Sequence, residues 1–235
     1  FVDLETTGGS AQHDRITEIA IIRVEGESVT RYQSLLNPQQ RISYFIESIT
    51  GISNAMVADA PEFAEVADEV WTWLQDCVFV AHNVRFDYGF LKQAFERVGK
   101  DFQPEQLCTV KLSRRLYPEH KHHGLDQLIE RHGLRMSQRH RAMADADAIY
   151  QFWQIVHQEF AADVLQAACL KVMNKPSLPV YLNPPNIDTL YNGYGVYLIY
   201  GDNDLPLYIG KSKTVKTRLL AHFRSDVVSG KEMAL

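Results

Sequence analysis

The sequence contains little cysteine and no long hydrophobic run, and each shortage excludes a class of protein. Its three cysteines are odd in number and far apart among the 235 residues: Cys77, Cys108 and Cys169. This spacing excludes a disulfide framework or a zinc ribbon and fits a reducing cytoplasm. No apolar stretch approaches the length of a membrane span, and no secretory signal pattern or glycine-rich phosphate loop is present. We therefore expect a cytoplasmic protein without a membrane anchor.

The chain also lacks an initial methionine. Phe1 already lies within an apolar strand pattern, so we expect further sequence upstream of it. With 46% hydrophobic and 23% charged residues, the chain has enough apolar material for a packed core. Its length suits one large domain, or one domain and part of another.

An excess of positive charge is missing too, because the formal net charge is −5. Residues 1–173 contain 17 Lys+Arg and 24 Asp+Glu, whereas residues 174–235 contain 7 and 5. Within the acidic part, the segment 111–141 holds eight basic residues against three acidic ones. Phosphate binding needs such a local patch rather than a high overall pI, although solvated helix faces explain many of these charges as well. The composition permits a nucleic-acid partner without requiring one.

Hydrophobic periodicity in residues 1–173 predicts strands first and helices later. Strands are expected at 1–5, 16–24, 29–36 and 78–81, with a hairpin turn at Glu25-Gly26-Glu27. Helices are expected at 62–75, 87–98, 110–117, 125–132 and 142–164. In the last helix, the apolar stripe consists of Ile149, Trp153, Val156 and Phe160. This order predicts an α/β fold with a mixed β-sheet flanked by helices.

The composition changes after residue 173. Four prolines within residues 174–192 and the lack of helical periodicity predict a linker. Two short strand patterns at 196–200 and 206–209 follow, and a basic helix begins near Val215. We expect a first domain at 1–173, a Pro-rich linker at 174–192, and at 193–235 the beginning of a small α/β domain that is too short for a comfortable core of its own.

Four acidic residues are candidates for a metal site. Asp3 and Glu5 are two residues apart on a strand, so both carboxylates point to one face. Their mutual repulsion is relieved by a hard cation such as Mg²⁺; an exposed acidic strand face is the alternative. Asp87 begins a helix, where N-capping is the alternative role. Asp145 lies near the start of the long helix, and Asp147, two residues on, must point elsewhere.

One histidine is a candidate general base. His140 precedes the long helix, in a loop that can place it beside the acidic residues. An imidazole can accept a proton from water near neutral pH. A surface histidine in a basic loop is the alternative.

Three motifs, in this order, resemble those of the DEDDh exonucleases: Val-Asp-Leu-Glu-Thr-Thr-Gly, His-Asn-Val-Arg-Phe-Asp and His-x4-Asp. The likeness is greatest to the proofreading epsilon-type domains of bacterial replicative polymerases and covers nearly all of residues 1–160. It implies an RNase H-like fold and 3′→5′ hydrolysis of DNA to 5′-mononucleotides. It implies two Mg²⁺ or Mn²⁺ ions held by Asp3, Glu5, Asp87 and Asp145, with His140 as general base. The residues near the terminal nucleotide would be Leu4, Thr6, Thr7, His82 and Asn83.

A second pair of motifs lies beyond the predicted linker. Gly-Val-Tyr at 195–197 and Tyr-Ile-Gly at 208–210, followed by several basic residues, resemble the start of a GIY-YIG endonuclease domain of the kind found in the UvrC excision-repair nuclease. The resemblance implies a nicking site that includes Tyr197, Tyr208, Arg218 and His222. The metal-binding glutamate of that family should lie well beyond Arg218, and Glu232 comes too soon. We therefore expect a truncated domain that does not cut; two ordinary strands with tyrosines are the alternative.

Together these patterns predict a metal-dependent DNA exonuclease tethered to a nicking domain, in bacterial DNA repair or proofreading. The expected partners are single-stranded DNA or 3′ ends and a polymerase or repair complex. A 3′ exoribonuclease is an alternative, because no motif reports a contact to the 2′-OH. The other alternative is a non-catalytic strand-binding module of such a complex, against which the five filled catalytic positions argue.

Overall fold

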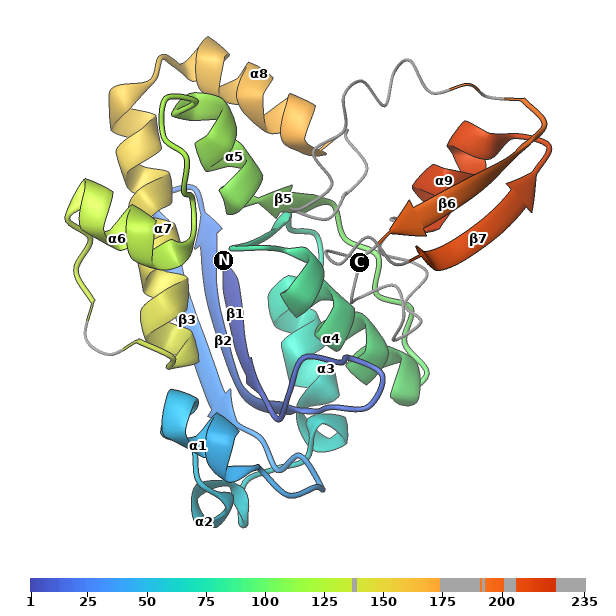
Figure 1. Cartoon of the computed structure of the whole chain (residues 1–235). Coiled ribbons are helices and arrows are strands. Elements are labelled where there is room, and N and C mark those ends of the chain that lie inside the picture. The colour runs from blue at the N-terminus through green and yellow to red at the C-terminus, as the bar shows by residue number, and fades with distance from the viewer. Residues whose placement is uncertain (137–138, 174–190, 192, 201–205, 223–235) are drawn as a thin grey trace. The chain divides into compact units, whose positions relative to one another are not determined.

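In the computed structural model, the described residues are 1–136, 139–173, 191, 193–200 and 206–222. The chain divides into two units, Phe1–Asn174 and Lys175–Leu235, which are considered separately (Figure 1). Within the described ranges, no helix is long and apolar enough to cross a membrane.

The first unit is built on an antiparallel sheet in the order β1-β2-β3. Its strands are β1 (Val2–Thr6), β2 (Ile16–Glu25) and β3 (Ser28–Leu35). The predicted hairpin turn is confirmed, and Gly26 has a φ of 58°, which glycine adopts without strain. Because β2 is the central strand, both of its faces are buried, which explains its nearly continuous apolar run.

Two shorter strands, β4 (Phe79–Ala81) and β5 (Gln106–Cys108), pair in parallel. The hydrogen bonds therefore form two sheets rather than the single mixed sheet that we expected. β4 packs next to β1, so the strands still make one layer with antiparallel and parallel parts. The strand β5 was not predicted, because three residues are too few to show a period.

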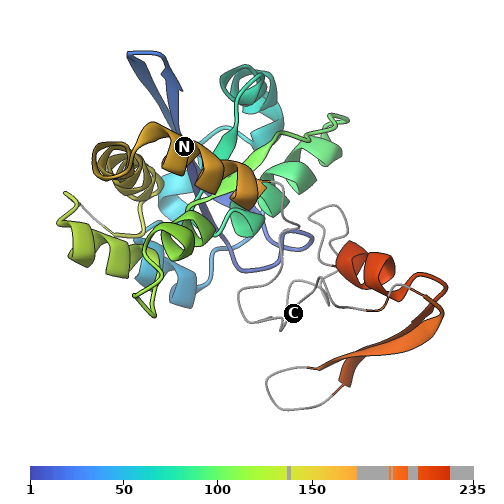
Figure 2. The same cartoon turned by 90° about the horizontal axis from the view of Figure 1, so that it is seen from above.

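Helices cover both faces of this layer (Figures 1 and 2). On one face, α7 (Ala142–Glu159) packs against β1 and β2, and α6 (Leu125–His132) packs against α7. The other side carries α3 (Phe63–Leu74) and α4 (Arg85–Arg97). In the fully buried part of the contact between α7 and the sheet, the helix contributes the small side chains of Ala142 and Ala146, which pack against Ala20 and Ile22. Their size brings the first turns of α7 close to the strands.

The prediction of one long helix over 142–164 is wrong. α7 ends at Glu159, Phe160 has extended backbone angles, and α8 (Ala162–Met173) follows. The buried residues of α8 are Leu165, Ala168 and Val172. The step from Phe160 to Leu165 is five residues and breaks the three-four spacing, so one straight helix cannot bury both stripes. The break lets α8 pack on β5 and on α5 (Thr109–Leu116).

Two short helices between β3 and α3 were not predicted: α1 (Tyr44–Thr50) and α2 (Asn54–Val57). The hydroxyls of Ser43 and Ser53 accept N-cap hydrogen bonds at their starts, and Gly51 ends α1 with a φ of 69°. These two serines and the glycine were the available signals. With so few residues in each helix, no apolar period develops.

The second unit contains a hairpin and a helix: β6 (Gly195–Tyr200), β7 (Pro206–Ser212) and α9 (Val215–His222). Tyr197 and Ile199 are buried on the face of β6 that Val215 and Leu219 of α9 cover. The three elements match the two strands and the basic helix expected there. Apart from Tyr191, the predicted linker at 174–192 lies outside the described residues, as does Glu232.

Candidate functional site

The acidic pair of β1 lies on the sheet face that α7 covers. In the antiparallel register, Asp3 lies opposite Ala20, and Glu5 lies opposite Glu18. Ala20 contacts Ala142 and Ala146 at the start of α7, so the same face carries Asp3 and Glu5 towards that helix. Two residues of spacing on a strand are therefore enough to bring both carboxylates to the first turn of α7.

The turn after β4 supplies the next residues. Asn83 has a φ of 66°, a left-handed conformation that asparagine tolerates better than most residues. The bend leads directly into α4, which begins at Arg85, so Asp87 is the third residue of that helix. Asp87 is therefore not the N-cap, which is Val84. Its buried carboxylate accepts hydrogen bonds from the backbone N–H groups of Asp87 itself and Leu4.

The loop before α7 closes the site. His140 has a φ of 56°, an uncommon conformation for a residue with a side chain. The bend places the His140 ring near Asp145, which is in the first turn of α7. Ligand atoms of Glu5, His140 and Asp145 all lie within 4.8 Å of one another. Asp147, one residue beyond Ala146, faces away and pairs with Arg31 at 3.1 Å, as its spacing from Asp145 predicts.

These side chains line a cleft of about 290 Å³. Of the predicted residues, the lining includes Asp3, Leu4, Glu5, His82, Asn83, Asp87, His140 and Asp145. Thr6 and Thr7 are buried beside the cleft but do not line it. The Thr6 hydroxyl donates to the carbonyl of Gly8 at 2.7 Å, and the Thr7 hydroxyl accepts from the N–H of Arg15 at 3.0 Å. Both threonines shape the turn after β1.

The electrostatics of the cleft reflect crowded negative charge. Burial, and then the nearby Asp87, Asp145 and Glu5 carboxylates, raise the pKa of Asp3 well above its ordinary value. Burial and Asp145 raise the pKa of Glu5 to about 7. Burial also raises the pKa of Asp87. A carboxylate with a raised pKa lacks compensating positive charge. The positive groups around this cleft therefore do not balance its acids.

His82 forms part of the wall between β4 and α4. Its Nδ1 lies 3.0 Å from the Thr109 hydroxyl, and burial lowers the pKa of its imidazole to about 4. The ring is therefore neutral at pH 7. A neutral imidazole can face a nucleotide without adding positive charge to the cleft.

Three lining residues were not assigned a role from the sequence: Phe86, Leu125 and Arg139. Phe86 lies within the second motif that carried the resemblance, and Leu125 is the first residue of the predicted helix at 125–132. Arg139 was only one of eight basic residues in segment 111–141. It contacts the carboxylate of Asp145 and also pairs with Asp126 of α6 at 2.5 Å. Its role depends on contacts that spacing alone does not show.

A buried carboxylate that we did not predict, that of Glu18 on β2, holds the start of α7 in place beside the site. Glu18 is fully buried and accepts hydrogen bonds from the Arg141 guanidinium at 2.7 Å, the Ala142 N–H at 3.0 Å and the Gln33 amide at 2.8 Å. Burial alone would raise the pKa of Glu18, but these contacts, above all the hydrogen bonds from Arg141, hold it below its ordinary value. The signal for this residue was an acidic side chain within the apolar run of β2.

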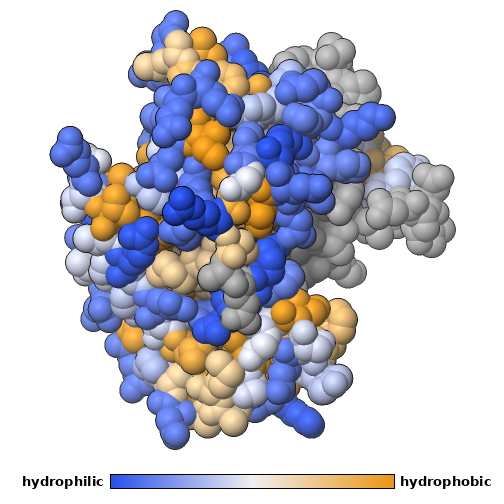
Figure 3. Space-filling model, turned by 90° about the vertical axis from the view of Figure 1, so that its left-hand side faces the viewer, coloured by the Kyte–Doolittle hydropathy of each residue, from blue (hydrophilic) through white to orange (hydrophobic). Residues whose placement is uncertain are grey.

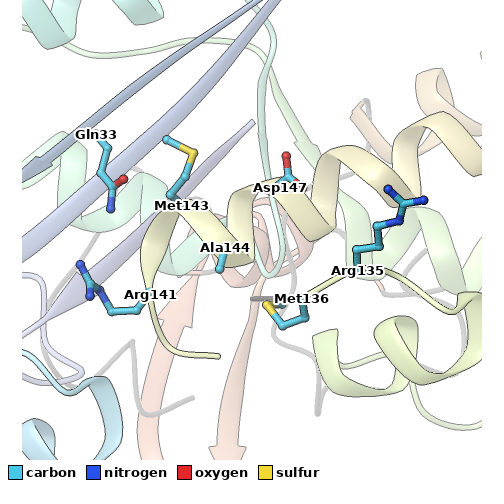
Figure 4. A pocket seen from close by; sticks show the side chains of 7 residues that line it. All are labelled: Gln33, Arg135, Met136, Arg141, Met143, Ala144 and Asp147. Atoms are coloured by element: carbon cyan, nitrogen blue, oxygen red, sulfur yellow. The ribbon is translucent and has the colours of Figure 1, made fainter. Parts of the chain in front are cut away.

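Gln33 and Arg141 also line a separate hollow of about 640 Å³ between β3 and the start of α7 (Figure 4). Arg135 and Met136 lie at its other side, and Met143 and Asp147 project from α7 (Figure 4). The side of the molecule seen in Figure 3 is mainly hydrophilic, with hydrophobic residues scattered over it. The hollow shares none of its lining residues with the acidic cleft.

In the second unit, the predicted tyrosines and arginine lie close together. The β6–β7 register places Tyr197 opposite Gly210, and the rings of Tyr197 and Tyr208 stack with centroids 6.0 Å apart. A side chain at Gly210 would meet the Tyr197 ring at 2.4 Å. Burial and Tyr208 raise the pKa of Tyr197, and a hydrogen bond with Arg218 opposes this rise. The side chain of His222 lies outside the described part of the chain.

The residues of the acidic cleft fit divalent cations. Asp145 Oδ1 is buried and accepts no hydrogen bond from the described residues. An unpaired buried carboxylate oxygen is costly unless a cation reaches it. Together with the oxygens of Asp3, Glu5 and Asp87, it forms the oxygen-rich ligand set that Mg²⁺ and Mn²⁺ prefer.

Known proteins match this unit. A family model described as Exonuclease (RNase_T) matches residues 1–152. The chain is 40% identical over 159 residues to the PolC-type DNA polymerase III of Staphylococcus saprophyticus, and 40% identical over 161 residues to that of Staphylococcus aureus. Each match spans 66% of this chain but only 11% of the polymerase's length.

Solved structures agree with these sequence matches. A structure of exonuclease X in complex with 5′ overhanging duplex DNA is 27% identical, with a TM-score of 0.54 over 72% of this chain and 97% of that chain. A structure of exonuclease I has a TM-score of 0.63 over 71% of this chain and 42% of its own. At 22% identity, the second likeness establishes the fold alone.

Proposed function

The chain belongs to the exonuclease family, and from that premise we propose that its first unit removes nucleotides from the 3′ ends of DNA strands. The observation that supports this most directly is the meeting of four carboxylates and His140 around one cleft. DNA as the substrate is supported by the identity to PolC-type DNA polymerases and the likeness to exonuclease X bound to DNA. The products would be 5′-mononucleotides.

In this proposal, Asp3, Glu5, Asp87 and Asp145 hold two divalent cations. When bound, such ions lower the pKa of an attacking water and stabilise the leaving 3′ oxygen. His140 accepts the proton of that water from its position beside Glu5 and Asp145. Leu4, His82 and Asn83 line the same cleft and would hold the terminal nucleotide, while Thr6 and Thr7 would act by fixing the turn after β1.

The first experiment is a time course on 5′-labelled single-stranded DNA with Mg²⁺ or Mn²⁺, against an EDTA control. We expect a ladder of shortened products that vanishes with EDTA. Asp145→Asn should lower the rate at least a thousandfold, whereas the matched variant Asp147→Asn, two residues along the same helix, should stay within about twofold. An active Asp145→Asn enzyme would refute the site, and equal or faster cleavage of RNA of the same sequence would refute the preference for DNA.

A second candidate function concerns the second unit, for which we propose the beginning of a GIY-YIG nicking domain. Its support is the stacked Tyr197–Tyr208 pair beside Arg218. Because Tyr197 is buried and Tyr208 is exposed, Tyr208 is the better candidate for activating water. Arg218 would bind a phosphate. The tethering of this unit to the exonuclease would suit DNA repair or proofreading.

The test of the second function is duplex DNA binding by the whole chain, measured by fluorescence anisotropy. Arg218→Gln and Lys211→Gln should weaken binding of a blunt duplex severalfold while the cleavage rate of a short single strand stays unchanged. Unaltered duplex binding by both variants would speak against a nucleic-acid role for this unit.

A further inference from the structure

Arg139 lies between two carboxylates of very different exposure. Its Nη1 donates to Asp145 Oδ2, and its Nε donates to Asp126 Oδ1 at 2.5 Å. The side chain of Asp145 is 6% exposed, and that of Asp126 is 67% exposed. The guanidinium thus reaches from the wet rim of the acidic cleft to one of its buried acids.

The position of the guanidinium overlaps with the position that a metal ion would need. Asp145 is one of the acids proposed as metal ligands, and Arg139 already contacts one of its two oxygens. The other oxygen is buried and accepts no hydrogen bond from the described residues. With metal ions in the cleft, the guanidinium and a cation would compete for the same carboxylate, and two positive groups so close together repel each other.

Asp126 can keep its ion pair with Arg139 when Arg139 leaves Asp145. It lies in the first turn of α6, outside the set of acids that line the cleft. A guanidinium held there by its Nε still has donors on its two terminal nitrogens. Paired donors of this kind match the oxygens of a phosphate.

We propose that Arg139 is a phosphate-binding residue whose availability depends on the metal: it rests on Asp145 in the metal-free protein and, when divalent cations bind, keeps Asp126 and turns to a phosphate at the 3′ end of the strand. This inference rests on the proposed function, since it assumes a strand in the cleft. It adds a coupling, because the strand then binds better after the cations than before them.

A thermodynamic cycle tests the coupling. The dissociation constant of a fluorescent single-stranded DNA is measured by anisotropy in EDTA and in Ca²⁺, for the unaltered chain and for Arg139→Gln, with strand length checked on a gel. In Ca²⁺ the variant should bind about tenfold more weakly, the loss expected for one charge-assisted contact. In EDTA the two proteins should agree within about twofold.

Two controls separate this contact from a general loss of charge. Arg135→Gln removes a neighbouring exposed arginine of the same loop, which lines the separate hollow. This variant should change the DNA dissociation constant by no more than about twofold, both in EDTA and in Ca²⁺. A strand whose terminal linkage is a neutral methylphosphonate should bind the unaltered chain and Arg139→Gln equally. The proposal would be overturned by a tenfold loss of DNA affinity in Arg135→Gln. It would also be overturned if Arg139→Gln bound the neutral strand tenfold more weakly than the unaltered chain does.

Metal binding provides a readout that needs neither DNA nor cleavage. Because Arg139→Gln removes a competitor for Asp145, calorimetric titration with Mn²⁺ should show tighter binding to this variant than to the unaltered chain. A salt bridge that only holds the loop in place predicts weaker Mn²⁺ binding and an equal loss of DNA affinity with and without Ca²⁺. Either result would refute the proposed movement of Arg139 from Asp145 to a phosphate, even if the chain cleaves DNA. If the unaltered chain binds Mn²⁺ and DNA without cleaving, the proposed function fails while the cycle still decides the role of Arg139.

Discussion

Glu18 and Arg141 form an ion pair that joins the centre of the sheet to the start of α7. Glu18 is fully buried on β2. Arg141 is the N-cap residue of α7, and its guanidinium binds the Glu18 carboxylate at 2.7 Å. The next residue, Ala142, donates its N–H to the same carboxylate at 3.0 Å. This pair fixes the segment that carries His140 on one side and Asp145 on the other. It therefore determines where two of the proposed functional groups stand.

Glu18→Gln should destabilise the first unit by about 2–4 kcal/mol, because the half-buried Arg141 loses its charged partner. Arg31→Gln is the matched control, since its pair with Asp147 is exposed and should be worth no more than about 1 kcal/mol. Urea unfolding followed by circular dichroism gives both values. Equal losses for the two variants would show that the buried pair has no special structural role.

In the metal-free protein, the carboxyl groups of the cleft should lower stability as the pH rises from 5 to 8, whereas buried His82, whose pKa is lowered to about 4, opposes this loss up to about pH 6.5. The carboxyl groups of Asp3, Glu5 and Asp87 have pKa values raised in the folded state. As the pH passes their ordinary values, the unfolded chain releases protons that the folded chain retains, and unfolding becomes more favourable. For Glu5 this loss continues up to a pH of about 7.

Added Mn²⁺ should reverse that trend. The cation replaces the retained protons, so the rise in melting temperature caused by 1 mM Mn²⁺ should be larger at pH 8 than at pH 5. Scanning fluorimetry at four pH values measures it, and Asp3→Asn should reduce the difference. A rise independent of pH would mean that Mn²⁺ binds away from these acids.

Asn83→Ala should cost about 1 kcal/mol of stability, whereas Asn83→Gly should cost less, because only the alanine is strained at a φ of 66°. Both variants remove the same amide from the cleft, so comparing them isolates the backbone. Thermal unfolding in EDTA is the measurement. A glycine variant less stable than the alanine variant would show that strain at this bend does not decide the stability here.

Gly210→Ala should open the second unit without affecting the first. An added Cβ would meet the buried Tyr197 ring at 2.4 Å, so the ring must leave its stack with Tyr208. Limited proteolysis should then cut within residues 193–222 sooner, while the melting temperature of the first unit stays constant. Gly9→Ala, where an added Cβ meets nothing within 4 Å, is the control and should resemble the unaltered chain.

Much of the first unit follows from hydrophobic periodicity. The β2–β3 hairpin and α6 were predicted almost to the residue, because apolar, β-branched runs flank the Glu25-Gly26-Glu27 turn and a period of three to four persists over α6. The short elements α1, α2 and β5 were missed, since none is long enough to repeat a pattern. The break at Phe160 was missed for another reason: no Gly or Pro marks it, and Val164, which is exposed, continues the apolar spacing of Val156 and Phe160.

The candidate site shows the same division. Asp3, Glu5, Asp87, His140 and Asp145 were found because their motifs and order carry a resemblance, and the fold brings them together. Glu18 and Arg139 were not assigned roles, because an ion pair between distant segments has no local signature. The charges of both residues were visible in the sequence, but their partners were not. Glu18 pairs with Arg141, which lies 123 residues along the chain, and Arg139 pairs with acids on two different helices.

The functional groups of the cleft come from three separate stretches: the end of β1, the turn into α4 and the start of α7. None of them can meet another until the chain has closed loops of many tens of residues, which is slow compared with forming a helix or a hairpin. During refolding, secondary structure should therefore recover before the cleft does. The time at which cleavage returns after dilution from denaturant reports the last long-range contacts to form, so the catalytic reaction is itself a clock for the completion of folding.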